Sequence, residues 1–170
     1  MSPIEIRLDP RLMESLLETI SPTLELLDNE LASAAPLPED DELLEDFWKS
    51  DLLRSQREEL TVVARLFDEE FMSTGRAVIA PEDMDKVIRA CSAIRLKLRE
   101  SKLKALGDEQ LERGELDDVE WTEDLQISYA AYSLFASLQE LIVSEISDPE
   151  GFEEQYGDEL GDDDSDRDAR

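Results

Sequence analysis

Residues 123–146 have the sequence EDLQISYAAYSLFASLQELIVSEI, and their hydrophobic pattern predicts the fold class. One set of apolar side chains recurs every three or four positions, namely Ile127, Ala131, Leu134, Leu138 and Leu141. Tyr132 and Phe135 add apolar surface on other sides of the same helix. A helix that is apolar over most of its circumference is typical of a buried position. We therefore predict that this is the last and central helix of an all-α bundle.

Capping and breaking residues divide the preceding chain into further helices. Pro81, with two acidic residues after it, is typical of a helix start, and Gly107 is typical of a helix end. An amphipathic stripe beginning near Asp51 stops at Gly75, a residue suited to the left-handed backbone beyond a helix. We expect a short separate helix before that stripe, through Leu43, Leu44, Phe47 and Trp48.

The amino-terminal part of the chain contains an extended segment and one more helix. Apolar and polar residues alternate over residues 4–8, which is the period of a short, half-buried strand. Asp9 and Pro10 then form a capping signal before a leucine-rich helix. Pro22 predicts a kink or a break within that helix. Residues 34–41 contain two prolines and no hydrophobic period, so we expect a connection there.

The carboxyl-terminal segment, residues 148–170, has 11 acidic residues against two arginines and few apolar side chains. Such a composition buries too little apolar surface to fold, so we predict a disordered acidic tail. Its densest charges are Asp162, Asp163, Asp164, Asp166 and Asp168. Residues 1–147 are enough for one hydrophobic core. The sequence therefore predicts a single helical bundle of four to six helices, with a short amino-terminal extended segment and this tail.

Composition excludes several classes of function. The chain has 45 acidic and 17 basic residues and no histidine, which gives a formal charge of −28. Because a charge this negative repels a phosphate backbone, we expect no direct binding of nucleic acid. The single cysteine, Cys91, cannot form an internal disulfide, and it lies on an apolar stripe where burial makes a thiol inert. A reducing compartment fits this cysteine usage.

The sequence favours a cytoplasmic location without membrane contact. The first residues lack the basic start and the apolar run of a secretory signal. The longest uncharged run, residues 125–139, is shorter than the roughly 20 apolar residues that a membrane-spanning helix needs.

Catalytic machinery is missing from the sequence patterns. Without histidine the chain lacks the commonest general base and the commonest metal ligand. The glycines form no phosphate-binding loop, and the acidic clusters mostly fall outside the apolar stripes, as solvated helix faces do. We therefore predict no catalytic residue, no metal site and no cofactor.

One basic helix face departs from the overall charge. Seven lysines and arginines lie between residues 86 and 104, where Glu100 is the only acidic residue. Arg95, Arg99 and Lys102 share one face because they stand four and three positions apart. The cations either pair with acidic neighbouring helices, which we favour, or form a docking stripe for an acidic group of a partner or of the tail.

Two adjacent aromatic residues, Phe47 and Trp48, are further candidates for partner binding. Exposed aromatic side chains are favoured anchors at protein interfaces. The alternative, which we favour for this pair, is that they close the hydrophobic core of the bundle.

Three segments in this order resemble a known family. Residues 8–10 are LDP, residues 52–60 are LLRSQREEL and residues 88–98 are IRACSAIRLKL. Together with the apolar last helix, they resemble the bacterial DUF2017 family of uncharacterised proteins over roughly residues 4–146. This resemblance implies an all-helical cytoplasmic protein, and it assigns no catalytic residue.

The sequence therefore predicts a non-enzymatic interaction or regulatory protein that binds a protein partner through the helical domain, the acidic tail or both. Two alternatives stay open, a carboxylate- or metal-dependent enzyme on a helical scaffold and an acidic inhibitor that mimics DNA. The negative charge is also compatible with adaptation to a salty cytoplasm. The partner and the oligomeric state do not follow from the sequence.

Overall fold

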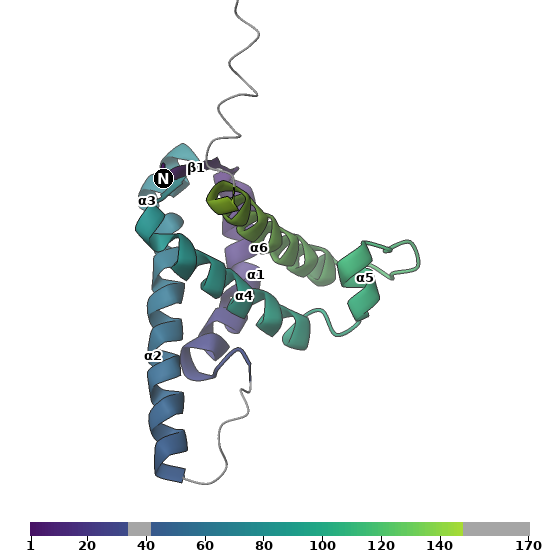
Figure 1. Cartoon of the computed structure of the whole chain (residues 1–170). Coiled ribbons are helices and arrows are strands. Elements are labelled where there is room, and N and C mark those ends of the chain that lie inside the picture. The colour runs from purple at the N-terminus through teal and green to yellow at the C-terminus, as the bar shows by residue number, and fades with distance from the viewer. Residues whose placement is uncertain (34–41, 148–170) are drawn as a thin grey trace, which may run out of the picture.

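The computed structural model describes residues 1–33 and 42–147, and these form an all-α fold with one small two-stranded ribbon (Figure 1). The predicted fold class is confirmed for these residues. The predicted connection at 34–41 and the predicted acidic tail at 148–170 lie outside the described residues.

The predicted amino-terminal extended segment is strand β1 (Ile4–Arg7), which pairs antiparallel with strand β2 (Arg76–Ile79). Gly75 precedes β2 with φ 70°, and a Cβ atom there would lie 2.7 Å from the backbone oxygen of Leu8. The backbone N–H of Leu8 donates a 2.9 Å hydrogen bond to the Gly75 carbonyl. Gly75 thus lets the chain approach β1 closely, and a 3-10 turn, η1 (Pro81–Asp83), follows β2.

Helix α1 (Pro10–Asn29) begins at the predicted cap, where the Asp9 carboxylate accepts a 2.9 Å hydrogen bond from the backbone N–H of Arg11. The helix is continuous through Pro22, so of the two predicted alternatives, a kink or a break, the break is wrong. Pro22 lies on the exposed side of α1, where water can bind the carbonyl that a proline leaves unpaired.

The next two helices divide the chain differently from the prediction. Helix α2 (Glu42–Leu66) is one helix across the predicted boundary near residue 50, and a separate helix, α3 (Glu69–Thr74), follows it. The break between them arises at Asp68, whose carboxylate accepts a 3.0 Å hydrogen bond from the backbone N–H of Phe71. The turn also buries both Phe67 and Phe71, whose rings meet edge to face at 5.1 Å. Gly75 ends α3 as predicted.

Helix α4 (Met84–Ser101) ends before Gly107, so the predicted end is wrong, and a short helix, α5 (Asp108–Arg113), follows it. The chain leaves the helix just after Ser101 and so buries Leu103 and Leu106 in the core. This burial favours the turn over continuation of α4.

Helix α6 (Glu123–Ser147) begins after Thr122, whose hydroxyl accepts a 3.2 Å hydrogen bond from the backbone N–H of Leu125. The predicted central position of α6 is wrong. Helix α4 packs against α1, α2 and α6, and Figure 1 shows it between α2 and α6. Helix α6 packs mainly against α4 and α1, and its Val143 is 49% exposed. The fully buried side chains of α4 include Val87, Ala90, Cys91, Ile94 and Leu98.

Candidate functional site

Most cations of the predicted basic face form ion pairs with acidic residues on neighbouring segments. The five that do so are Lys86, Arg89, Lys97, Arg99 and Lys102. Their partners include Glu59 on α2, Asp108 on α5 and Asp124 on α6. These pairs agree with the interpretation that the cations of α4 neutralise acidic neighbours.

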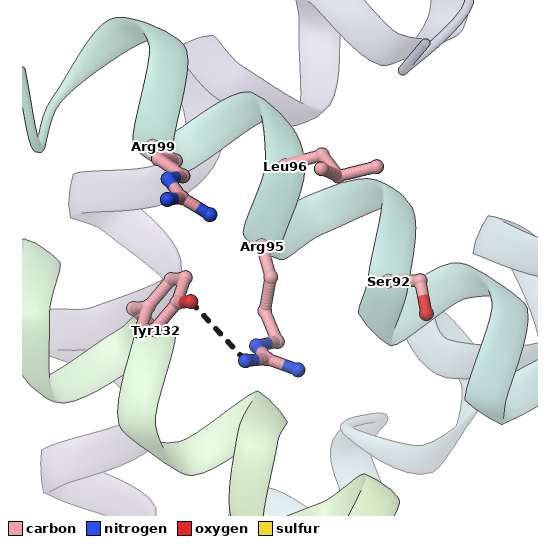
Figure 2. A pocket seen from close by; sticks show the side chains of 5 residues that line it. All are labelled: Ser92, Arg95, Leu96, Arg99 and Tyr132. Carbon is pink, nitrogen blue, oxygen red and sulfur yellow. Dashed lines mark hydrogen bonds between the residues drawn. The ribbon is translucent and has the colours of Figure 1, made fainter. Parts of the chain in front are cut away.

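Arg95 is bound differently, because its partners in the described structure are uncharged. Its Nη1 donates to the Gln139 side-chain oxygen at 2.6 Å, and its Nη2 donates to the Tyr132 hydroxyl at 3.1 Å (Figure 2). The guanidinium carbon also lies 4.7 Å from the centroid of the Tyr132 ring. Arg95 is half buried and forms no ion pair with a described residue.

The amide group of Gln139 fixes this arrangement. Its Nε2 donates to the Ile88 carbonyl at 3.0 Å and to the Ser92 hydroxyl at 2.6 Å. Because both amide protons are used on α4, the Gln139 oxygen is left to accept from Arg95. The Nε of Arg95 is buried and has no hydrogen-bond partner among the described residues. The guanidinium of Arg95 is therefore neither neutralised nor fully hydrogen-bonded by residues 1–33 and 42–147.

Arg99 lies one helical turn after Arg95 and binds Asp108 at the start of α5. Its Nε donates to the Asp108 carboxylate at 2.9 Å, and its Nη2 contacts the same oxygen. This hydrogen bond raises the pKa of Arg99 above its usual value. Lys102, the third candidate on this face, lies 3.5 Å from the Asp124 carboxylate and lines none of the cavities described below.

The structure brings two of the predicted residues into one pocket. Ser92, Arg95, Leu96, Arg99 and Tyr132 line a cavity of about 250 Å³ between α4 and α6. Figure 2 shows the side chains of Arg95 and Arg99 leaving α4 on the side where Tyr132 lies. We call this cavity the arginine pocket.

A larger groove adjoins the arginine pocket. It has a volume of about 480 Å³ and runs between α2, α4 and the segment after α1. Its lining includes Leu52 and Arg89, and it shares Ser92 and Leu96 with the arginine pocket. The two hollows therefore lie next to each other along α4.

The other two predicted residues, Phe47 and Trp48, lie near the amino-terminal end of α2. They are 70% and 52% exposed, so the prediction that they close the core is wrong. Figure 1 shows this end of α2 far from α6. Within the part of the chain that the structure describes, the first turns of α2 extend away from the other helices, as Figure 1 shows. Leu52, one turn after Trp48, is 40% exposed and lines the groove.

Gln56 is a structural residue that the sequence analysis missed. It is buried, and its Nε2 donates to the carbonyls of Leu27 and Glu30 at 2.6 and 2.8 Å. Its oxygen accepts a 2.9 Å hydrogen bond from the backbone N–H of Ala32. One side chain of α2 thus binds three backbone groups at the end of α1. The sequence signal that could have identified Gln56 is its position as a polar residue within the apolar stripe that begins near Asp51.

Two other residues of α4 lie inside the fold. Cys91 is fully buried as predicted, and burial raises the pKa of its thiol to about 12. Lys97 is also buried, and its ammonium lies 2.9 Å from the Glu30 carboxylate. The hydrogen bond to Glu30 raises the pKa of Lys97.

Other features of the described residues bear on function. Within residues 1–33 and 42–147, no three His, Cys, Asp or Glu side chains are grouped to hold a metal ion. Over the same ranges, the helices lack the length and apolar character needed to span a membrane. The acidic candidates of the tail lie outside these ranges. Comparison with protein families, curated proteins and solved structures finds no match to this chain.

Proposed function

We propose that the protein is a non-enzymatic, cytoplasmic interaction or regulatory protein that binds a protein partner through the α2 apolar face, defined as Phe47, Trp48 and Leu52. The exposure of this face carries the proposal, because 70% of Phe47 and 52% of Trp48 are accessible to solvent. Clustered exposed apolar side chains mark interaction sites, and aromatic residues are enriched in interface cores.

The α2 apolar face continues into the groove. Trp48 and Leu52 are four residues apart and so lie on the same side of α2. Leu52 lines the groove together with Leu96, which is 43% exposed on α4. A partner that covers the aromatic pair can therefore also place apolar side chains in the groove.

The charge of the chain selects a partner that is basic around its apolar contact. The chain carries a formal charge of −28. The two cations beside the α2 apolar face, Lys49 and Arg54, are already paired with Glu45 and Asp51. Lysines and arginines bordering an apolar segment of the partner would accelerate association and gain ion pairs at the rim.

The test is a pull-down from native low-salt lysate with tagged full-length protein, followed by calorimetry with each purified candidate partner. The Phe47→Ser, Trp48→Ser double variant is compared with Leu12→Ser, which changes a side chain 55% exposed on α1. We expect a basic partner that the wild type and Leu12→Ser bind equally well. The double variant should bind it at least about tenfold more weakly, a loss of about 1.4 kcal/mol.

Three results would contradict the proposed binding through the α2 apolar face or the proposed non-enzymatic role. A partner bound with the same affinity by the double variant excludes the α2 apolar face. Loss of that partner when the five tail aspartates become asparagine assigns recognition to the tail. Turnover of a small-molecule substrate by the purified chain would exclude a non-enzymatic role.

A further inference from the structure

The positive charge of Arg95 has no counterpart among the described residues. Four other basic side chains in residues 1–33 and 42–147 also form no ion pair, namely Arg11, Arg65, Lys104 and Arg113. All four are exposed, so water solvates their charge. Arg95 is half buried, and its hydrogen-bond partners are the neutral groups of Gln139 and Tyr132. Burial without an opposite charge is unfavourable, so an anion near Arg95 would be stabilised.

A second cation borders the same cavity. Arg99 is one turn from Arg95, and like charges at this spacing repel each other. Asp108 neutralises Arg99, and it does not line the cavity. The arginine pocket therefore has a net charge of one positive unit.

The hydroxyl groups of the pocket are arranged as donors. The Tyr132 hydroxyl accepts from Arg95, and the Ser92 hydroxyl accepts from Gln139. Each hydroxyl therefore keeps its own proton available to a ligand. Two guanidinium groups and two hydroxyl donors around one cavity are suited to the oxygen atoms of an anion.

We propose that the arginine pocket binds a carboxylate. One carboxylate matches the single unbalanced charge, whereas a phosphate dianion would leave excess negative charge in a chain of net −28. Leu96 and the ring of Tyr132 give the cavity an apolar wall for a short hydrocarbon chain next to the carboxylate. This inference rests on the arginine pocket alone and does not depend on the α2 apolar face.

The size of the cavity restricts the ligand and leaves two sources of the carboxylate. A volume of about 250 Å³ holds a short carboxylic acid or one acidic side chain. The first source is a free acid of a few carbons. The second is the predicted acidic tail, because Ser147 lies about 22 Å along α6 from Tyr132 and a disordered chain of this length spans about 26 Å.

The test is a titration of the full-length chain with sodium butyrate, monitored by NMR of the arginine Nε–H groups. Ionic strength is held constant with sodium chloride, and the buffer contains no carboxylate. We expect saturable shifts of the Arg95 and Arg99 signals. Arg95→Gln should weaken binding at least about tenfold, whereas Arg89→Gln should change it less than about twofold because Arg89 is paired with Glu59 outside this pocket.

A second chain distinguishes the two sources. It carries asparagine at the five tail aspartates, Asp162, Asp163, Asp164, Asp166 and Asp168. Equal butyrate affinity in this chain and in the wild type assigns the pocket to a free acid. Tighter binding by the asparagine chain, with Arg95 signals already displaced in the wild type, assigns it to the tail.

Three results overturn the proposal. One is the absence of saturable shifts at Arg95 and Arg99 in both chains. Another is unchanged butyrate affinity in Arg95→Gln, or in Arg95→Lys if the first variant does not fold. The third is tighter binding of inorganic phosphate than of butyrate at the same pH. Such binding would contradict the argument that the single positive charge of the arginine pocket is matched by one carboxylate.

Discussion

Helix α4 and the first turns of α2 have the opposite placement from the one their compositions suggest. Helix α4 is rich in lysine and arginine, yet it lies between α1, α2 and α6 and leaves Ile94 only 1% exposed. The start of α2 carries an aromatic pair, yet Phe47 is 70% exposed. Burial therefore depends on how many neighbouring segments a helix meets, and not on its composition alone.

Helix α4 occupies the centre because its neighbours match its polar side chains. Arg89 binds Glu59 on α2, Arg95 binds Gln139 on α6 and Lys97 binds Glu30 after α1. The long stems of lysine and arginine cover apolar surface while their charged ends reach these partners. At the start of α2, Phe47 and Trp48 stay at the surface.

The strongest test of this contrast removes apolar volume from α4. Ile94→Ala leaves a cavity among fully packed side chains, so we expect the free energy of unfolding to fall by about 2–5 kcal/mol. Urea denaturation of the full-length chain measures the loss. A fall below about 1 kcal/mol would show that α4 is not the centre of the core.

A smaller loss is expected where α2 holds the end of α1. Gln56→Ala leaves the Leu27 and Glu30 carbonyls and the Ala32 N–H without their side-chain partner. We expect a loss of about 1–3 kcal/mol in urea denaturation, since unpaired buried polar groups are costly. Ser55→Ala, next to Gln56 on the exposed side, serves as the control. Equal losses of unfolding free energy in Gln56→Ala and Ser55→Ala would contradict the role of Gln56 in holding the end of α1.

The pH dependence of stability tests the ion pair between Lys97 on α4 and Glu30. The pKa of Lys97 is raised in the folded state, mainly by its hydrogen bond to Glu30. The contribution of the charged Lys97 to the free energy of unfolding is therefore fully present below the pKa that Lys97 has in the unfolded chain. It is lost as the pH rises through the pKa that Lys97 has in the folded state. We expect Lys97→Met to lose about 1 kcal/mol or less at neutral pH, because Glu30 is largely exposed.

The measurement is the difference in unfolding free energy between wild type and Lys97→Met from pH 7 to strongly alkaline solution. This difference should shrink as the pH rises. Lys104→Met, at an exposed position, controls for the general loss of a cation. A difference that grows with pH would contradict the raised pKa.

The smallest effect is expected at the α2 apolar face. Phe47→Ala should change the free energy of unfolding by no more than about 0.5 kcal/mol, because the ring is mostly exposed. Urea denaturation is again the measurement. A loss approaching that of Ile94→Ala would show that this face is buried in solution, for example between two copies of the chain.

Local signals in the sequence were sufficient for several boundaries. Thr122 caps α6, Gly75 ends α3, and Asp9 with Pro10 begins α1, because a cap depends on a few adjacent residues. The central helix was not predictable in this way. Choosing α4 over α6 requires knowing that Glu59 and Glu30 lie beside α4, and those contacts are distant in sequence.

The candidate site was predictable in part for the same reason. The four-residue spacing of Arg95 and Arg99 placed both on one face of α4. Tyr132 and Gln139 come from α6, 37 and 44 residues after Arg95, and no periodicity relates them to it. The exposure of Phe47 likewise depends on where α2 extends beyond its neighbours.

The β1–β2 ribbon sets the order in which the chain folds as it leaves the ribosome. Residues 4–7 cannot pair until residues 76–79 have been synthesised, and closing so long a loop is slow. The faces of α1 and α2 that pack against α4 stay uncovered for longer, until α4 is complete at residue 101. More than half of the nascent chain is therefore synthesised before its core can close, and over that interval its apolar surface stays uncovered.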